Sequence, residues 1–508
     1  MTSSSGLSGL QHWRVLASSN WNTGEFEMNA SVFPFGFREY DARWHYPDQI
    51  NPLGLQCLGA GFATQLVRMG HPEPRVVVGH DYRSYSSAVK HAVTVGLLSA
   101  GCRVEDVGLA LTPMAYFAQQ HFDNCAAAMV TASHNENGWT GLKVSDRPPV
   151  THGPKEMSEL KDIVLAGEYV TGKGSYTHRP EVRALYVDEL CAGPRLKKPV
   201  RVVVATGNGT MGAFAPEVFS RLGCEVLPLD THLDWSFPKY NPNPEDLKAL
   251  HALVAEVRAQ NADLGLAFDG DGDRVGVVDD RGEEIFSDKI GLLIARQLAV
   301  EHPGSRFVVD VKSTGLFESD PILEKNGAAV EYWTTGHSYL KRRINETKAL
   351  AGFEKSGHFF FAPPVGRGYD DALVSATRVL RLLDQSDEPL SKLRLTLRHT
   401  WQSPTMAPFC EEQHKYNVVR DILSEYERAR QDGETVCGLP ITNLVTVNGV
   451  RVTLSDGTWG LVRASSNKPS LVVVTESPTS DTLMRCMFAD IDRRLQATGQ
   501  IGEYDQKL

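Results

Sequence analysis

The chain has 508 residues, of which 42% are hydrophobic and 22% are charged, and its formal net charge is −10. This length is too great for one hydrophobic core, so we expect three or four domains. The negative charge and the lack of a dense basic run exclude a general nucleic-acid-binding surface and attachment to an anionic membrane. No apolar run approaches the roughly 18–20 residues of a membrane-spanning helix. We therefore expect neither a nucleic acid nor a membrane as a partner.

The ends and the cysteines say little about function. Residues 1–30 are expected to form a loosely ordered extension, and their Ser-rich start lacks the basic-then-apolar pattern of a secretory signal. The eight cysteines are scattered and form no CxxC pair or metal-binding spacing. This pattern predicts reduced, mostly buried thiols in a cytoplasmic protein.

Three short valine-rich segments are each followed by a polar turn and a helical pattern: Arg75–Gly79, Arg201–Ala205 and Arg306–Val311. In each case a second predicted strand lies about 25 residues further on. Continuous apolar strands that alternate with amphipathic helices are typical of parallel or mixed sheets covered on both faces. The pattern predicts a weak threefold repeat of α/β domains.

The last hundred or so residues change character. Val445–Leu454, a turn at Asp456-Gly457, Gly460–Ala464 and Leu471–Thr475 predict a β-meander, and Ser480–Gln496 predicts a closing helix with Ser480 as its N-cap. This is the pattern of an α+β domain. We place the extension at 1–30, three α/β domains at 31–175, 176–288 and 289–397, and the α+β domain at 398–508.

A candidate nucleophile lies on a predicted turn. Met129–Thr131 ends a strand, the turn follows as Ala132–Asn135, and Lys143 comes ten residues after Ser133. A nucleophilic or phosphorylated serine needs exposure, nearby hydrogen-bond donors and a cation. The alternative is a serine that only caps a polar turn, which is the commoner role of serine at such positions.

Three carboxylates occupy alternate positions in the turn Asp269–Arg274, between the predicted strands Leu264–Phe268 and Val275–Val278. Like charges so close repel one another, and a bound cation relieves the repulsion. An EF-hand loop also begins with acids at this spacing, but its sixth position requires Gly and here is Arg274. We predict a divalent-cation site; a solvated acidic turn is the alternative.

Two further loops carry polar groups suited to a sugar phosphate. Glu354, Ser356 and His358 offer a carboxylate, a hydroxyl and an imidazole, which suit recognition of sugar hydroxyls or proton transfer. Residues 463–469 join two strands with an arginine, a lysine, hydroxyls and turn amides, and so predict a phosphate-binding nest. The alternatives are a polar loop before Phe359–Phe361 and an ordinary β-turn.

Residues 207–212 match GxGxxG, and Asp230 lies 18 residues after Gly212. By pattern this is a dinucleotide-binding fingerprint. A lone GxGxxG is a weak signal, and a tight strand-to-helix turn without a ligand explains it equally. No other feature of the chain asks for a nicotinamide, although a NAD-linked enzyme stays an alternative.

Considered together and in order, these motifs resemble the α-D-phosphohexomutase family, which comprises phosphoglucomutases and phosphomannomutases. The matching segments are Phe37–Arg43, Thr131–Asn135, Asp269–Arg274, Thr335–Lys341, Glu354–His358, Gly368–Asp371 and Arg463–Pro469. The resemblance runs from about residue 36 to 497. It implies an α/β fold with four domains around a central cleft, three mixed-sheet α/β domains and a C-terminal α+β domain. In this family the 207–212 stretch is a scaffold turn.

The resemblance also implies a reaction: Ser133 carries a phosphoryl group, one Mg²⁺ assists its transfer, and hexose 1-phosphate and hexose 6-phosphate interconvert through a hexose 1,6-bisphosphate that also acts as activator. The implied catalytic residues are Ser133, Lys143, His134, Arg43, Arg274 and His358. The implied metal ligands are Asp269, Asp271, Asp273 and phosphorylated Ser133. The implied substrate-binding residues are Tyr40, His337, Lys341, Glu354, Ser356, His358, Arg463, Ser465, Ser466 and Asn467.

Several points stay open at this level. Lys355 stands where Met or Gln is common in the family, so the preferred sugar, mannose, glucose or glucosamine phosphate, is undecided. Either Lys143 or His358 transfers the proton. The protein is a monomer or a homodimer. A phosphoglucosamine mutase and an inactive sugar-phosphate-binding paralogue are the alternative functions.

Overall fold

A computed structural model describes residues 29–466 and 468–508, so the predicted extension lies almost wholly outside the described residues. The chain divides into two compact units. The first contains the residues up to Arg183 except 111–113 and 149–151, and these two short segments belong to the second unit together with Ala184–Leu508. None of the helices within the described ranges is long and apolar enough to cross a membrane.

The first unit is built on a mixed sheet with the strand order β1-β5-β4-β2-β3-β7. β2 pairs in parallel with β3 and β4, whereas β5 runs antiparallel to β4 and β1. The strands are β1 (Ala42–His45), β2 (Arg75–His80), β3 (Arg103–Leu109), β4 (Ala126–Val130), β5 (Trp139–Arg147) and β7 (Ser175–His178). β4 is buried throughout, as expected for a strand covered on both faces.

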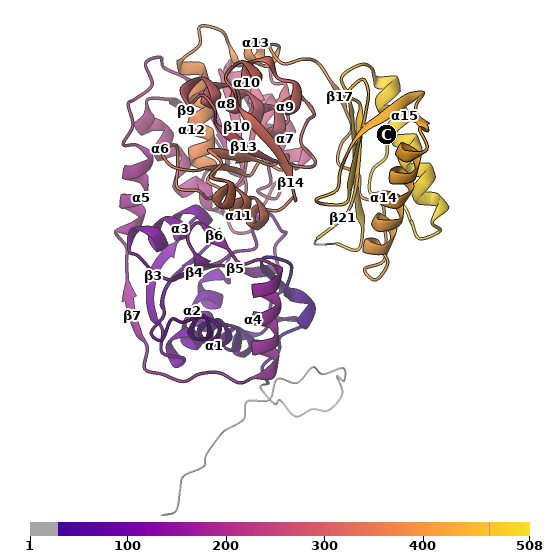
Figure 1. Ribbon diagram of the computed structural model, residues 1–508. Coiled ribbons are helices and arrows are strands. Elements are labelled where there is room, and N and C mark those ends of the chain that lie inside the picture. Colours follow the sequence, from indigo (N-terminus) through magenta and orange to yellow (C-terminus); the bar gives the residue numbers. More distant parts are fainter. Residues whose placement is uncertain (1–28, 467) are drawn as a thin grey trace, which may run out of the picture. The chain divides into compact units, whose positions relative to one another are not determined.

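Two helices of the first unit pack side by side in Figure 1, α1 (Pro52–Arg68) and α2 (Ser86–Ser99). Asn51 caps α1 by accepting a hydrogen bond from the backbone N–H of Gly54 at 2.8 Å. The two helices approach closely because Gly96 has no side chain: a Cβ there would lie 2.0 Å from the carbonyl oxygen of Gln56. The other helices here are the 3₁₀ turn Pro34–Gly36, α3 (Thr112–His121), whose first two residues belong to the second unit, and α4 (Pro154–Ala166).

The second unit contains three sheets, of which two are mixed. One has the order β12-β11-β10-β8-β9, with β8 (Arg201–Ala205), β9 (Glu225–Leu229), β10 (Leu264–Phe268), β11 (Val275–Asp279) and β12 (Glu284–Ile285). The other has the order β14-β13-β15-β16, with β13 (Arg306–Asp310), β14 (Ala329–Trp333), β15 (Ala351–Phe353) and β16 (Phe359–Phe361). The short strand β6 (Val150–Thr151) also belongs to this unit.

The helices of the second unit are distributed between these sheets and the last one. They are α5 (Val182–Leu190), the 3₁₀ turn Thr210–Ala213, α6 (Ala215–Leu222), α7 (Leu247–Gln260), α8 (Ser287–Glu301), α9 (Leu316–Ser319), α10 (Pro321–Lys325), α11 (His337–Thr347), α12 (Ala372–Asp384), α13 (Leu390–Arg394), α14 (Lys415–Gln431) and α15 (Asp481–Ala497).

The predicted threefold repeat is confirmed by strand order. Each mixed sheet contains four strands in which the first lies between the second and the third, and the fourth runs antiparallel to the third: β3-β2-β4-β5, β9-β8-β10-β11 and β14-β13-β15-β16. The three predicted first strands coincide with β2, β8 and β13 to within one residue. Low sequence identity hides this repeat because a buried parallel strand requires only apolar residues.

The C-terminal sheet has the order β17-β22-β21-β20-β19-β18, and all its pairings are antiparallel. Its strands are β17 (Trp401–Gln402), β18 (Thr435–Val436), β19 (Leu439–Val445), β20 (Val450–Leu454), β21 (Trp459–Ala464) and β22 (Leu471–Ser477). Helices α14 and α15 cover one face of this sheet (Figure 1) and share its hydrophobic core.

Two predictions for this region are tested directly. The N-cap is confirmed, since the Ser480 side chain accepts a hydrogen bond from the Leu483 N–H at 3.1 Å. The single strand predicted over Val445–Leu454 is wrong: β19 ends at Val445 and β20 begins at Val450. Gly449 turns the chain between them with a φ of +80°, and a Cβ there would lie 2.1 Å from the Val462 carbonyl oxygen.

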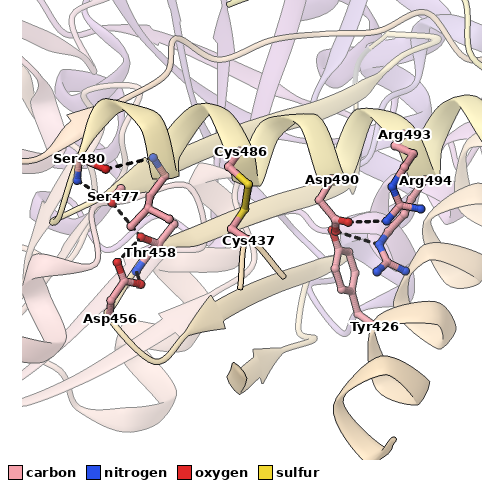
Figure 2. Close-up of a disulfide and its surroundings, with 11 residues drawn as sticks. Tyr426, Cys437, Asp456, Thr458, Ser477, Ser480, Cys486, Asp490, Arg493 and Arg494 are labelled. Atoms are coloured by element: carbon pink, nitrogen blue, oxygen red, sulfur yellow. Dashed lines mark hydrogen bonds and ion pairs between the residues drawn. A yellow bond between two sulfur atoms is a disulfide. The ribbon is translucent and has the colours of Figure 1, made fainter. Parts of the chain in front are cut away.

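The prediction that every cysteine is a reduced thiol is wrong for two of them. Cys437, in the turn between β18 and β19, forms a disulfide with Cys486 of α15 (Figure 2), and their Cα atoms are 5.9 Å apart. The two cysteines are 49 residues apart in sequence, so no local spacing of cysteines predicts that they pair. The other six cysteines are free thiols. The cysteine pattern therefore does not support the cytoplasmic location, which stays a prediction.

The disulfide is expected to stabilise the C-terminal sheet against unfolding. Replacing both Cys437 and Cys486 by serine should lower the free energy of unfolding by up to about 4 kcal/mol, because the link closes a long loop in the unfolded chain. Chemical denaturation of this variant, beside a Cys191→Ser control that removes a free thiol, measures the effect. Equal stability of the two variants would contradict the prediction.

Candidate active site

Three of the loops singled out in the sequence occupy the same place in the three mixed sheets. Each connects the third strand of its repeat to the antiparallel fourth strand: residues 131–138 join β4 to β5, 269–274 join β10 to β11, and 354–358 join β15 to β16. We name them the serine loop, the aspartate loop and the sugar loop. In open α/β sheets such positions, beyond the carboxyl ends of the parallel strands, are the usual sites of ligand binding.

The serine loop belongs to the first unit and follows β4 directly. Ser133 has a φ of +51°, a left-handed conformation that is uncommon for a residue other than glycine. Its N–H donates to the hydroxyl of Thr131 at 2.8 Å, and its Oγ lies 3.2 Å from Nδ1 of His134. Only 3% of Ser133 is exposed, whereas the sequence predicts an exposed serine. The loop folds back on its supporting side chains, which explains the difference.

Two of these supporting residues carry no prediction from the sequence. The Asp81 carboxylate accepts hydrogen bonds from the Thr131 hydroxyl at 2.8 Å and the Ala132 N–H at 3.2 Å. The Arg83 guanidinium donates to the carbonyl oxygen of Ser133 at 3.0 Å. Both follow β2, which pairs in parallel with β4, so they come to the same edge of the sheet. Polar residues directly after the neighbouring strand are the signal that could have identified them.

The structure also brings Arg43 to the serine loop. Its guanidinium donates to the Ala132 carbonyl oxygen and to the Asn135 side chain, both at 2.8 Å, and pairs with Asp41 at 2.8 Å. Lys143 is buried on β5, in register opposite Met129 of β4. Tyr40 is half-buried just before β1. These predicted residues and Ser133 therefore belong to one unit.

The aspartate loop belongs to the second unit and is fully buried. One oxygen of Asp269 accepts hydrogen bonds from the N–H groups of Gly272 at 3.1 Å and of Asp273 and Arg274 at 3.2 Å. Its second oxygen accepts from Nε of Arg274 at 3.1 Å. Asp271 accepts from the Thr112 hydroxyl at 2.6 Å. The loop is therefore held by its own backbone amides and by Arg274.

These carboxylates fit a divalent cation. Asp269, Asp271 and Asp273 each offer an oxygen, and the three oxygens lie within 4.8 Å of one another. Carboxylate oxygens are the ligands that Mg²⁺ prefers, and three buried negative charges with one adjacent arginine leave room for a cation's charge. Gly272 has a φ of +75°, and a Cβ there would lie 2.7 Å from the Met211 sulfur, so the loop requires glycine at this position.

The sugar loop lies directly beside the aspartate loop. The Val275 N–H, at the start of β11, donates to the Gly357 carbonyl oxygen at 3.3 Å. His358 lies 3.7 Å from Asp273 and 2.9 Å from Asp370. The sequence predicted both loops separately, and only the packing of β11 against the sugar loop brings them together.

Within the sugar loop, Glu354 is the central acceptor. It accepts hydrogen bonds from the Ser356 hydroxyl at 2.9 Å and the Gly336 N–H at 3.0 Å. Burial raises the pKa of Glu354, and the charge of His358 opposes this. Burial by itself would lower the pKa of His358, but Asp273 and Asp370 outweigh it and raise that pKa.

The segment 335–341, predicted to assist sugar recognition, packs on the same loop. His337 begins α11, is 5% exposed, and its ring centroid is 5.8 Å from that of His358. Lys341 is fully buried and donates to Asp370 at 2.8 Å. Asp370 thus joins Lys341 to His358.

Lys355 and its surroundings hold a further residue that sequence reasoning missed. Asp310, at the end of β13, accepts from the Lys355 N–H at 3.3 Å and from the Thr335 hydroxyl at 3.0 Å. Burial lowers the pKa of Lys355, and the ammonium lies 5.6 Å from the centroid of the Phe286 ring. Asp310 is the last residue of β13, and Asp81 directly follows β2, the equivalent strand of the first repeat. The threefold repeat is therefore the signal that could have identified Asp310.

The predicted phosphate-binding segment joins β21 to β22. Arg463 is 7% exposed and donates to the Ala464 carbonyl oxygen at 2.8 Å. Lys415, which begins α14, donates to the Ser465 carbonyl oxygen at 2.6 Å. Ser466 is half-buried. The predicted ligand residue Asn467 lies outside the described residues. Lys415 was not predicted, because it is about 50 residues away in sequence.

Protein atoms fill the space next to the GxGxxG segment, where a dinucleotide would have to approach. A Cβ on Gly212 would lie 1.9 Å from the Thr231 carbonyl oxygen, and Gly209 lies under Pro242. Asp230, the predicted ribose-binding acid, accepts from the Tyr240 hydroxyl and the Lys239 ammonium, both at 2.6 Å. These contacts agree with a scaffold turn.

Asp371, the neighbour of Asp370, gives a prediction for pH dependence. It caps α12 and accepts from the Tyr186 hydroxyl at 2.7 Å, and burial raises its pKa to about 6. A carboxyl whose pKa is raised on folding stabilises the folded state below its unfolded pKa, and this stabilisation disappears as the pH rises through about 6.

The Asp371→Asn variant can still cap the helix but cannot titrate. Between pH 4.5 and 7 the wild type should therefore lose about 2 kcal/mol of stability relative to this variant. Urea unfolding across this range measures the difference. Asp246→Asn, which changes the N-cap carboxylate of α7, is the matched control. A difference between wild type and Asp371→Asn that does not vary with pH would contradict the prediction.

Taken as a whole, mixed α/β sheets that present a buried acidic triad beside a polar sugar loop define an enzyme of metal-assisted phosphoryl transfer. Three family models match the chain, for alpha/beta/alpha domains I, II and III of phosphoglucomutase/phosphomannomutase, at residues 35–170, 184–282 and 286–399. The chain belongs to the phosphoglucomutase/phosphomannomutase family.

Individual relatives agree with this. The phosphomannomutase/phosphoglucomutase of Pseudomonas aeruginosa is 33% identical over 449 residues, which cover 88% of this chain and 93% of the relative. The phosphoglucomutase of Neisseria gonorrhoeae is 31% identical over 461 residues, covering 90% and 96%. A crystal structure of a phosphoglucomutase/phosphomannomutase family protein from Burkholderia thailandensis superposes with a TM-score of 0.84 at 29% identity, covering 94% of this chain and all of that one.

Proposed function

We propose that this protein is a phosphohexose mutase that interconverts hexose 1-phosphate and hexose 6-phosphate of mannose, glucose or both. The observation that carries the proposal is the contact between the aspartate loop and the sugar loop, where His358 lies 3.7 Å from Asp273. This contact supports the proposal because Glu354 and Ser356, which suit sugar hydroxyls, would then lie near carboxylates that suit a divalent cation. The names of the relatives support the same substrate class.

In the proposed reaction Ser133 is phosphorylated at rest. The bond between phosphorus and the serine Oγ breaks as a bond forms between phosphorus and the free C1 or C6 hydroxyl oxygen of the sugar, and either Lys143 or His358 takes the hydroxyl proton. Mg²⁺ held by Asp269, Asp271 and Asp273 would neutralise charge on the transferring phosphoryl group. The resulting hexose 1,6-bisphosphate turns in the site. The bond between its other phosphorus and the sugar oxygen then breaks as a bond to the Ser133 Oγ forms, and the residue that took the proton returns it to that sugar oxygen.

In this proposal the remaining residues orient the substrate and stabilise the transition state. Glu354 and Ser356 bind the sugar 3- and 4-hydroxyls, assisted by His337, Lys341 and Tyr40. The second phosphate of the substrate binds at Arg463, Ser465, Ser466 and Asn467. Arg43, Arg274, Lys143 and His134 spread the negative charge of the in-line transition state. Domain boundaries at 175, 288 and 397, a cytoplasmic location, and a monomer or homodimer complete the proposal.

The test is the conversion of glucose 1-phosphate and of mannose 1-phosphate, measured side by side with Mg²⁺ and catalytic glucose 1,6-bisphosphate. Turnover of both sugars, abolished by a chelator, is the expected result. Turnover of one assigns the preferred sugar. If neither is converted, glucosamine 1-phosphate decides between a phosphoglucosamine mutase and an inactive sugar-phosphate-binding protein.

A further inference from the structure

A cavity of about 510 Å³ lies within the second unit, and its lining contains none of the residues assigned to the reaction. Its walls come from α5, the segment after it, the end of β16 with the loop that follows, and a partly exposed side of α12; α5 and α12 are labelled in Figure 1. Its apolar lining residues are Tyr186, Leu190, Pro194, Phe361, Val365, Tyr369 and Val374. This volume is in the range of cavities that hold small ligands.

The cavity also carries positive charge. Four cationic side chains line it: Lys197, Arg367, Arg378 and Arg381. Burial lowers the pKa of Arg378, and the like charge of Arg381 adds to this against the opposing Glu301.

The acidic residues of the lining are already engaged. Glu189 pairs with Arg367, and Asp371 caps α12 and accepts from Tyr186. Asp384 accepts from the backbone N–H of Lys197 at 2.5 Å and lies 3.7 Å from Arg381. Three of the four cations already have acidic partners, since Arg378 also lies 3.4 Å from Glu301. The Lys197 ammonium is the exception and forms no ion pair with any residue in the described part of the chain. An anion in the cavity would pair with Lys197 and share the charge of Arg378 and Arg381 with their partners.

The cavity shares a wall with the candidate active site. Residues 369–371 run past β16, where Asp370 forms an antiparallel bridge with Phe360. Side chains of extended backbone alternate between two sides. Tyr369 and Asp371 line the cavity, and Asp370 between them contacts Lys341 and His358. A molecule in the cavity would therefore rest against the back of the segment that positions His358.

We propose that this cavity binds a small organic anion with a compact aromatic or branched apolar body. The anionic group pairs with Lys197, Arg378 and Arg381, and the apolar body packs between Tyr186 and Val374 on α5 and α12. Occupancy is sensed at the sugar loop through the alternating segment 369–371.

Isothermal titration calorimetry of the full-length protein with phenylphosphonate tests the proposal. This probe carries an aromatic ring and an anion but has no phosphoryl ester to transfer. We expect it to bind at least about ten-fold more tightly than methylphosphonate, which lacks the ring, and than benzyl alcohol, which lacks the charge. Val374→Trp, which fills the cavity, should weaken phenylphosphonate binding at least about ten-fold. Lys197→Gln should weaken phenylphosphonate but not benzyl alcohol.

The phosphate-binding segment is the competing site, so Arg463→Gln is the matched control. Binding that is lost in Arg463→Gln and kept in Val374→Trp overturns the proposal, as does the absence of binding to the wild type. Where Val374→Trp melts at a lower temperature, Thr377→Phe fills the same cavity from the next turn of α12. The link to the sugar loop predicts that phenylphosphonate shifts the KM for glucose 1-phosphate in the wild type and not in Val374→Trp. An equal shift in both proteins overturns that link.

Discussion

Replacing Ser133 by alanine is expected to reduce turnover by at least about four orders of magnitude while the protein still folds. The reaction needs an oxygen at this position to carry the phosphoryl group, and alanine has none. The fold should survive because the serine loop is held chiefly through its backbone: Asp81 binds the Ala132 N–H, and Arg83 and Arg43 bind carbonyl oxygens. Turnover of glucose 1-phosphate with added glucose 1,6-bisphosphate measures the loss.

The control for this substitution is Ser158→Ala, on the exposed side of α4 in the same unit. It should leave turnover unchanged. Mass spectrometry of the purified wild type should find a phosphoryl group that the Ser133→Ala variant lacks. Turnover by Ser133→Ala within about ten-fold of wild type would show that another residue carries the phosphoryl group.

Replacing Asp271 by asparagine is expected to lower turnover at least about a hundred-fold at millimolar Mg²⁺ and to raise the Mg²⁺ concentration needed for half-maximal activity. The substitution removes one negative charge from a buried triad whose oxygens lie within 4.8 Å of one another. Asparagine keeps an oxygen that can accept from the Thr112 hydroxyl, which Asp271 binds at 2.6 Å. The effect should therefore come from the lost charge and not from a disrupted loop.

Titration of activity with Mg²⁺ distinguishes the loss of a metal ligand from a disrupted loop. A structural defect would lower the maximum at every Mg²⁺ concentration without moving the midpoint, whereas a ligand defect moves the midpoint. Glu256→Gln, which removes one charge from the exposed face of α7, is the control and should not move it. An unchanged midpoint in Asp271→Asn would remove Asp271 from the metal site.

Local sequence predicted much of the fold because its signals are short. Leu264–Phe268 is predicted as a strand and found as β10 without a shift at either end. Ser480 is predicted to cap a helix and does so. In both cases the deciding interactions, burial of an apolar run and capping of free backbone amides, act between residues close in the chain. The loops that carry Ser133, Asp271 and Glu354 were found for the same reason.

Most of what the sequence missed are contacts between residues that are far apart in the chain. The Cys437–Cys486 disulfide spans 49 residues, and Lys415 reaches the carbonyl oxygen of Ser465 over 50. Asp81 and Arg83 support the serine loop from the end of the adjacent parallel strand. The single strand predicted over Val445–Leu454 was wrong because Gly449 can turn as well as extend, and the sequence does not show which its neighbours require.

The sequence by itself determined the family and the α/β class with its threefold repeat, and it located the loops for which a chemistry is proposed, because these depend on residue type and short spacing. Only the tertiary structure decided what each loop contacts. It placed His358 against Asp273, used Asp370 to join Lys341 to His358, and left a charged cavity behind that segment. The physical reason is that sheet order and strand register, which set these contacts, arise from the packing of whole elements and leave no local pattern in the chain.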